Sequence, residues 1–259
     1  MRCFRLELYT TWKALITSGA AVTGWQKFYV YFYQAFVEAD RWKQYLSGVG
    51  RTLYVTALAL ILGVILGVIV AVVRTAHDQQ RPGHRNPVLG ILNIIFKIYV
   101  TVIRGTPMMV QLLIMGFVIF SSSKNFALVG ALTLGINSGA YQAEIIRGGL
   151  MAVDHGQMEA GRSLGMNYVD TMRFVVVPQA VKAILPALGN EFIVLLKDTS
   201  LISVIGGKEL LYAARAIVSR TYEAMFPFLG TAVIYLILVM LFTWLLGIFE
   251  RRMRQSDRR

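Results

Sequence analysis

Long apolar stretches separated by short polar segments dominate the chain. A helix crosses about 30 Å of hydrocarbon with about 20 mostly apolar residues, and that criterion predicts five membrane spans. They are expected over residues 52–73, 106–120, 126–146, 181–205 and 226–249. The pattern therefore predicts an all-α polytopic membrane protein.

The apolar stretch over residues 87–120 is too long for one helix, and Arg104-Gly105-Thr106-Pro107 breaks it. We expect residues 88–103 to form an amphipathic helix in the membrane interface. Thr106 would then cap a new span, with Pro107 at its first position, where a missing N–H is harmless. Residues 1–25 receive no assignment.

Composition agrees with a membrane protein and excludes several other classes. Of 259 residues, 56% are hydrophobic and 15% charged, against about 25% charged in soluble domains. The net charge of +12 comes from 26 basic and 14 acidic residues, and it points to cytoplasmic loops and lipid headgroups. Since no basic stripe alternates with aromatic residues, we expect no nucleic-acid partner. One cysteine and three scattered histidines predict neither a disulfide nor a metal site.

Arginines mark the side of the membrane on which each loop lies, because cytoplasmic loops carry an excess of positive charge. The chain ends in a basic tail, so the C-terminus is expected inside the cell, together with the loops at 74–105 and 147–180. Five spans then put the N-terminus outside. That placement holds although residues 1–51 contain seven Lys/Arg and three Asp/Glu.

A short polar helix is predicted in the 147–180 loop. Asp154 is a natural N-cap, Gln157 stands where a capping box would use it, and Gly165 ends the helix. A helix of about 10 residues is unstable alone in water and must pack against something. Ala160 and Gly161 carry little side-chain bulk, which would allow a partner surface to approach closely.

Several motifs resemble a known family. Glu159-Ala160-Gly161 followed by Gly165 and then Val177-Pro178 resembles the EAA motif of the membrane subunits of ABC importers, whose coupling helix docks into the ATPase subunit. Other stretches are similar to permeases of the histidine, arginine, glutamine, glutamate and opine type. They are Arg104 to Pro107, Ala140 to Gly149, Asn190 to Ile193 and Leu196 to Leu201.

The resemblance covers about residues 46–255 and implies a domain organisation. Residues 1–45 would be an N-terminal extension of unknown role, residues 46–255 the transmembrane domain, and residues 256–259 a basic cytoplasmic tail. The resemblance also implies a location in the bacterial inner membrane.

The implied partners are two ATPase subunits, a second permease subunit that is the same or a sister chain, an extracytoplasmic amino-acid-binding protein and membrane lipid. Glu159, Ala160, Gly161 and Gly165 would couple the permease to the ATPase. No Gly-x-x-x-x-Gly-Lys-Ser/Thr motif occurs in the chain, so we expect no enzyme activity and no cofactor here, with ATP and Mg bound by the partner ATPase. The alternative is a secondary transporter driven by an ion gradient; the lack of detectable internal repeats argues against it.

Two carboxylates are candidates for binding the substrate. Glu191 and Asp198 are seven residues apart, which places them within about 20° on a helix and about 10 Å apart along its axis. Ionisable groups inside a span usually face a cavity or a partner. One could bind the α-ammonium and the other a cationic side chain, and Glu191 resembles the basic-amino-acid branch of the family. Alternatively, Lys197 or an arginine of another helix neutralises Asp198 for structural reasons.

Other polar residues are candidates to line the same path. Asn137, Tyr141 and Glu144 share one helical face, although Glu144 could equally pair with Arg147, and Gln111 could also face the path. Gly63 and Gly67 form a small-xxx-small pair, which favours helix packing over chemistry.

Overall fold

The computed structural model describes residues 2–80 and 86–256, and throughout these ranges the regular structure is helical. Arg81 and Arg85 of the first predicted cytoplasmic loop, and Arg258 and Arg259 of the tail, lie outside them. The helices are α1 (Arg2–Thr17), α2 (Gly24–Phe36), α3 (Trp42–Asp78), α4 (Pro87–Gly105), α5 (Met108–Ile114), α6 (Phe126–Met151), α7 (His155–Ser163), α8 (Tyr168–Thr171), α9 (Val177–Asp198), α10 (Leu210–Thr221) and α11 (Met225–Ser256). Short 3-10 or π-helical segments are η1 (Glu38–Asp40), η2 (Met115–Ile119), η3 (Met172–Val176) and η4 (Thr199–Ile205). The prediction of an all-α polytopic membrane protein is confirmed.

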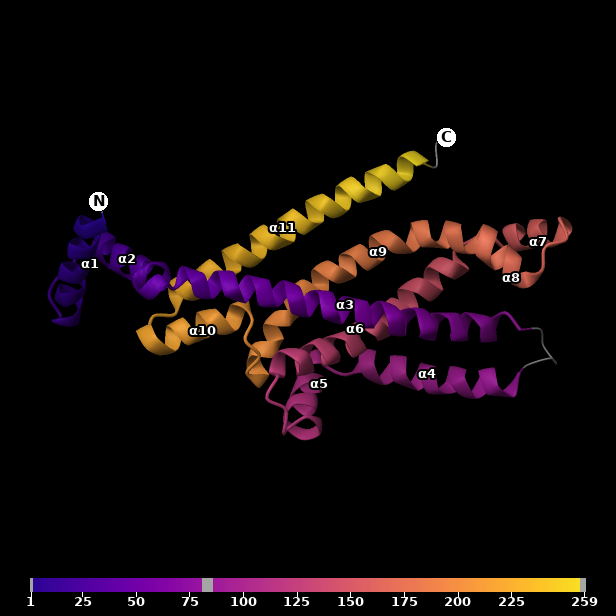
Figure 1. Ribbon diagram of the computed structural model, residues 1–259, viewed down its shortest axis with the longest axis horizontal. Helices are drawn as coiled ribbons and strands as arrows, with labels where there is room; N and C mark the ends of the chain where they lie inside the picture. Colours follow the sequence, from indigo (N-terminus) through magenta and orange to yellow (C-terminus); the bar gives the residue numbers. More distant parts are fainter. Residues whose placement is uncertain (1, 81–85, 257–259) are drawn as a thin grey trace.

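The long helices run side by side along one axis of an elongated bundle (Figure 1). Helices α7 and α8 and the start of α4 lie toward one end, and the C-terminal helix points the same way; α1, α2 and α10 lie toward the other. Four helical stretches in the described residues are long and apolar enough to cross a membrane: Glu38–Asp78, Pro87–Gly105, Tyr168–Ile205 and Met225–Met253.

The predicted assignment of residues 87–120 is wrong in two places. Helix α4 is 19 residues long with mean hydropathy 1.7, which makes it a candidate span and not an interfacial helix. The predicted span over residues 106–120 is a short apolar helix over Met108–Ile119, whose N-cap is Pro107 and not Thr106. A break at Gly105 and Thr106 separates these helices, so α4 takes the place of the second span and the predicted sides of the later loops stay the same.

Helix α6 is the centre of the bundle. It contains the predicted span 126–146, but it falls short of the apolar character of the four candidates because polar residues interrupt it. Those residues are Asn137, Ser138, Gln142 and Glu144. Its packing against α3 confirms the predicted role of the glycine pair: a Cβ on Gly67 would lie 2.8 Å from the Cβ of Gln142. The polar residues of α6 are thus covered by protein.

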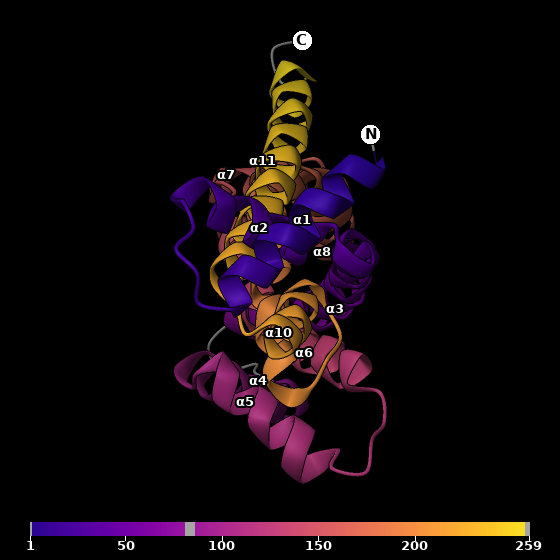
Figure 2. The ribbon, with the colours of Figure 1, turned by 90° about the vertical axis from the view of Figure 1, so that its left-hand side faces the viewer.

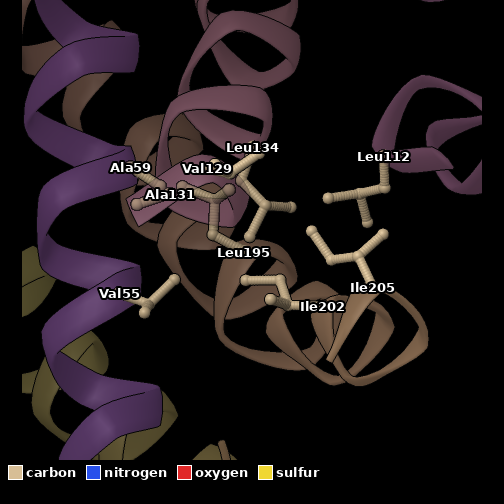
Figure 3. Packing of buried hydrophobic residues seen from close by; sticks show 9 residues of the cluster. All are labelled: Val55, Ala59, Leu112, Val129, Ala131, Leu134, Leu195, Ile202 and Ile205. Carbon is tan, nitrogen blue, oxygen red and sulfur yellow. The ribbon is translucent and has the colours of Figure 1, made fainter. Parts of the chain in front are cut away.

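The main hydrophobic core joins α3, α5, α6, α9 and η4 (Figure 3). Its buried members are Val55, Ala59, Leu112, Val129, Ala131, Leu134, Leu195, Ile202 and Ile205. Helix α9 continues without interruption through Pro186. The core therefore fixes the end of α9, where the candidate carboxylates lie, against α6.

Helix α10 is anchored at the end of the bundle opposite α7. Glu209 is its N-cap: the carboxylate accepts hydrogen bonds of 2.7 Å from the backbone N–H groups of Leu211 and Tyr212, and one of 2.9 Å from the hydroxyl of Tyr235 on α11. The side chain is buried, and this burial raises the pKa of Glu209 to about 7 although the hydrogen bonds oppose the shift.

Helices α1 and α2 form a hairpin on the outer end of α3 and α11, the end that faces the viewer in Figure 2. Glu38 ties the hairpin to α3, because its Oε1 accepts hydrogen bonds of 2.7 Å from both the Tyr9 hydroxyl and Lys13 Nζ. Its Oε2 lies 2.8 Å from Arg41. This arrangement places the N-terminus at the end opposite α7 (Figure 1).

Candidate functional site

Asn137 and Gln111 connect the central helix to α5. The Nδ2 of Asn137 donates a 3.0 Å hydrogen bond to Oε1 of Gln111. The Nε2 of Gln111 in turn donates 2.8 Å bonds to the carbonyl of Ile103 and to Oγ1 of Thr106. Both predicted path residues therefore meet, and they also satisfy backbone groups left open where α4 ends.

Ser138 and Glu191 connect the opposite side of the central helix to α9. The hydroxyl of Ser138 donates a 2.8 Å hydrogen bond to Oε1 of Glu191 and accepts one of 2.8 Å from Nε2 of the fully buried Gln142. Sequence analysis did not identify this serine as the partner of Glu191. The available signal was that Ser138, a small hydroxyl residue, directly follows Asn137, a candidate path residue on α6.

Asp198 is the last residue of α9, and the chain continues as a 3-10 helix. Because α9 is unbroken between Glu191 and Asp198, the predicted common face and the axial separation of about 10 Å hold. Asp198 is half-buried and, in the part of the chain that the structure describes, makes no side-chain hydrogen bond, whereas Lys197 beside it is exposed. One oxygen of Glu191 and the carboxylate of Asp198 are thus available for a ligand.

Arg104 adds a cation to this region. It was expected in a cytoplasmic loop, but it ends α4, with its guanidinium carbon 5.1 Å from the ring centre of Tyr141 on α6. Tyr141 is 37% exposed and Arg104 is exposed. The two form a cation–π pair beside Asn137 and Gln111. The wrong placement of α4 explains why the sequence analysis missed this residue.

Glu144 belongs to an ion-pair cluster instead of the polar line above. Its carboxylate binds Arg74 of α3 and, at 3.3 Å, Arg147; Arg147 also lies 3.6 Å from Asp78. Of the two alternatives for Glu144, the structure favours pairing. The cluster fastens the α7 end of α3 to the same end of α6.

Helix α7 has the predicted ends but not the predicted capping box. Asp154 is the N-cap, accepting a 2.6 Å bond from the N–H of Gly156, whereas Oε1 of Gln157 accepts from Gln179 of α9. At the other end Gly165 has φ +80°, and the N–H of Met166 donates to the carbonyl of Gly161 at 3.0 Å. This is a Schellman ending, and it turns the chain back toward α8.

The four candidate coupling residues divide between two faces of this segment. Glu159, Ala160 and Gly165 are exposed. Gly161 is buried: a Cβ there would lie 2.5 Å from Cγ2 of Thr171 on α8. Its missing side chain makes room for α8 of the same chain, and close approach of a partner at Gly161 stays a prediction. A cavity of about 350 Å³ lies beside α7 and reaches the end of α3 at Asp78.

A helical bundle of membrane-crossing length, with polar side chains and carboxylates gathered on its interior helices, has the organisation of a membrane transport protein. Residues 87–255 match a family described as "Binding-protein-dependent transport system inner membrane component", and the chain belongs to this family. It is therefore a multi-pass inner-membrane permease subunit, and the family implies ATPase and substrate-binding partners.

Relatives of known name agree with the family. The chain is 34% identical over 211 residues to a putative glutamine transport system permease protein of Rickettsia typhi, and 33% identical over 213 residues to the glutamine transport system permease protein of Escherichia coli K12. These alignments cover 80% and 81% of this chain, and 92% of each relative.

Solved structures are similar as well. A structure described as an amino acid ABC transporter with histidines has a TM-score of 0.72 and 42% identity, covering 81% of this chain and 94% of that one. A methionine ABC transporter in an inward-facing conformation has a TM-score of 0.71 at 21% identity, over 84% of this chain and 99% of that one; at that identity the likeness concerns the fold alone. Family membership decides against the secondary transporter considered above.

Proposed function

We propose that this permease forms the path for a polar amino acid in an ATP-driven importer, and that the amino acid is basic. The observation that carries the proposal is the pair of carboxylates on one face of α9, about 10 Å apart, a distance comparable to an extended arginine or lysine. Glu191 would bind the cationic side chain and Asp198 the α-ammonium. Gln111, Asn137 and Tyr141 would line the path on the facing side.

A second candidate substrate is glutamine, which the names of two relatives favour. The similar amino acid ABC transporter that is described with histidines supports a polar amino acid without choosing between the two. The deciding quantity is therefore the ratio of arginine uptake to glutamine uptake.

Changing Glu191→Gln tests the assignment of the substrate. The amide keeps the shape and the hydrogen-bond acceptor for Ser138 but loses the negative charge, and charge-assisted hydrogen bonds are about twice as strong as neutral ones. We expect arginine and lysine uptake to fall sharply in proteoliposomes containing the whole complex, while glutamine uptake is kept. Asp198→Asn should lower the uptake of every amino acid.

Ser138→Ala is the control for the structural contact, because it removes the hydrogen bond to residue 191 that Glu191→Gln keeps, and it leaves the charge of Glu191 in place. If Ser138→Ala changes the uptake ratio as much as Glu191→Gln does, the carboxylate acts only in holding α6 to α9. An unchanged ratio in Glu191→Gln would also contradict a basic substrate.

The proposal includes the assembly. Two ATPase subunits would bind ATP and Mg, and this chain would pair with itself or a sister permease below an extracytoplasmic amino-acid-binding protein. Helix α7 would dock on the ATPase through exposed Glu159 and Ala160. Gly165 would end the helix, and Gly161 would allow it to pack closely against α8. Residues 1–45 are proposed as an extension outside the transmembrane domain of residues 46–255, and residues 256–259 as a cytoplasmic tail.

A further inference from the structure

Three aromatic residues form a row on the outer side of α2. Trp25, Phe28 and Phe32, which we call the aromatic ladder, are 67%, 46% and 45% exposed. Their rings are nearly parallel: the centres of Trp25 and Phe28 are 5.5 Å apart, and those of Phe28 and Phe32 are 6.2 Å apart. Single exposed aromatic residues are ordinary, but a contiguous row of this size marks a surface that binds something.

The opposite side of α2 fixes the direction of the ladder. Val30 and Ala35 are buried, and Tyr33 stacks on Tyr9 of α1 at 4.4 Å. The ring of Phe36 at the end of α2 lies 5.4 Å from that of Tyr45 on α3. The fold therefore holds the ladder on the outer side of α2, where the described part of the chain covers it only in part.

The ladder adjoins the start of a lipid-facing helix. The ring of Phe226, in the first turn of α11, meets Phe28 edge-on at 5.2 Å and Phe32 at 6.4 Å. The most apolar stretch of α11 has mean hydropathy 2.6 and is largely uncovered by the rest of the chain, with Leu236, Ile237 and Met240 57%, 58% and 62% exposed. The ladder is thus continuous with a surface that hydrocarbon would cover, at the point where that surface ends.

We propose that α2 lies in the extracytoplasmic interface of the bilayer, with the aromatic ladder at the boundary between headgroups and acyl chains. Aromatic side chains concentrate at this depth, and amphipathic helices lie there in the membrane plane. The α1–α2 hairpin then anchors the outer ends of α3 and α11 to the membrane surface. This proposal depends on the membrane placement of the family and not on the identity of the substrate.

Spin labels test the depth of α2. In a Cys3→Ser background, a nitroxide is attached at Phe28→Cys, and the labelled permease is assembled with unlabelled partners in liposomes of phosphatidylglycerol and phosphatidylethanolamine. Accessibility to oxygen, which concentrates in lipid, is compared with accessibility to a water-soluble nickel chelate. Ile237→Cys, midway along α11 and 58% exposed, is the deep standard, and the exposed turn residue Ser18→Cys is the aqueous standard.

We expect the ratio of oxygen accessibility to nickel-chelate accessibility at the Phe28 label to lie between the ratios at the two standards. Replacing Trp25 and Phe32 by serine should shift it to the value at Ser18, whereas Tyr222→Ser, which removes a 93% exposed ring outside the ladder, should leave it unchanged. A label at Phe28 that matches Ser18 without those replacements overturns the proposal. So does a label shielded from both reagents, which would mean that another protein covers the ladder.

Discussion

Changing Gly161→Ala tests how α7 is seated. The new Cβ would lie 2.5 Å from Cγ2 and 2.8 Å from Oγ1 of Thr171, closer than real Cβ atoms approach other atoms. Thr171 is fully buried, and its hydroxyl donates a 2.9 Å bond to the carbonyl of Asn167, so it has little room to move. We therefore expect α7 to shift away from α8.

Overpacking of this kind costs about 1–3 kcal/mol. A difference of that size lowers the ratio of correctly seated to displaced α7 by about 5- to 150-fold. We expect substrate-stimulated ATP hydrolysis and uptake by the reconstituted complex to fall, by at most that factor, while the membrane helices remain folded, as measured by thermal unfolding.

The second variant, Thr171→Ala, removes the two nearest atoms that the new Cβ meets, Cγ2 and Oγ1, and leaves the Cβ of residue 171 at 3.2 Å. In the double variant Gly161→Ala/Thr171→Ala, coupling should return to near the level of Thr171→Ala alone. If the double variant stays uncoupled, Gly161 acts on the ATPase surface directly and not through α8, and the explanation given above for its burial is incomplete.

Three further predictions concern stability and sidedness. Because the pKa of Glu209 is raised from 4.5 to about 7, its contribution to stability is complete below pH 4.5 and is lost as pH rises through 7. The loss is about 3 kcal/mol. The unfolding temperature of the wild-type protein should therefore fall as the pH rises through this window, and that of Glu209→Gln should fall less. If the unfolding temperatures of the two proteins fall equally, other groups cause the pH dependence. Gly67→Ala should lower the unfolding temperature, because its Cβ would meet α6 at 2.8 Å, whereas Gly50→Ala on the same helix meets nothing within 4 Å and should not. In a Cys3→Ser background, an impermeant thiol reagent applied to whole cells should label Ser122→Cys and spare Ser256→Cys; equal labelling would contradict the assigned sides.

Hydropathy predicted the long helices well because it measures the property that a membrane selects. It failed over residues 87–120, where α4 carries Lys97 and Arg104 on an otherwise apolar helix. An amphipathic pattern has the same periodicity whether the polar side faces water at the interface or other helices inside a bundle. Only the packing of α4 against α3 and α6 separates these cases.

The candidate site was partly predictable from helical periodicity. The polar face of α6 identified Asn137, the position of Gln111 one turn after Pro107 made it a candidate for the same path, and helical spacing related Glu191 to Asp198. The bond between Ser138 and Glu191 joins residues 53 positions apart, and no local periodicity reports such a contact. The contact of Gly161 with Thr171 depends on the chain reversal at Gly165, so the sequence indicated the small residue but not the surface it serves.

The polar character of α6 has a consequence for how this protein enters the membrane. A helix that is apolar enough passes from the translocon into lipid on its own. Polar residues such as Asn137 and Gln142 oppose this transfer into lipid. Since Gly63 and Gly67 on α3 leave room for Gln142 in the finished bundle, α3 supplies a surface on which α6 becomes favourable in lipid. We therefore expect insertion of α6 to depend on the earlier presence of α3, with neighbouring helices released cooperatively in the order of synthesis.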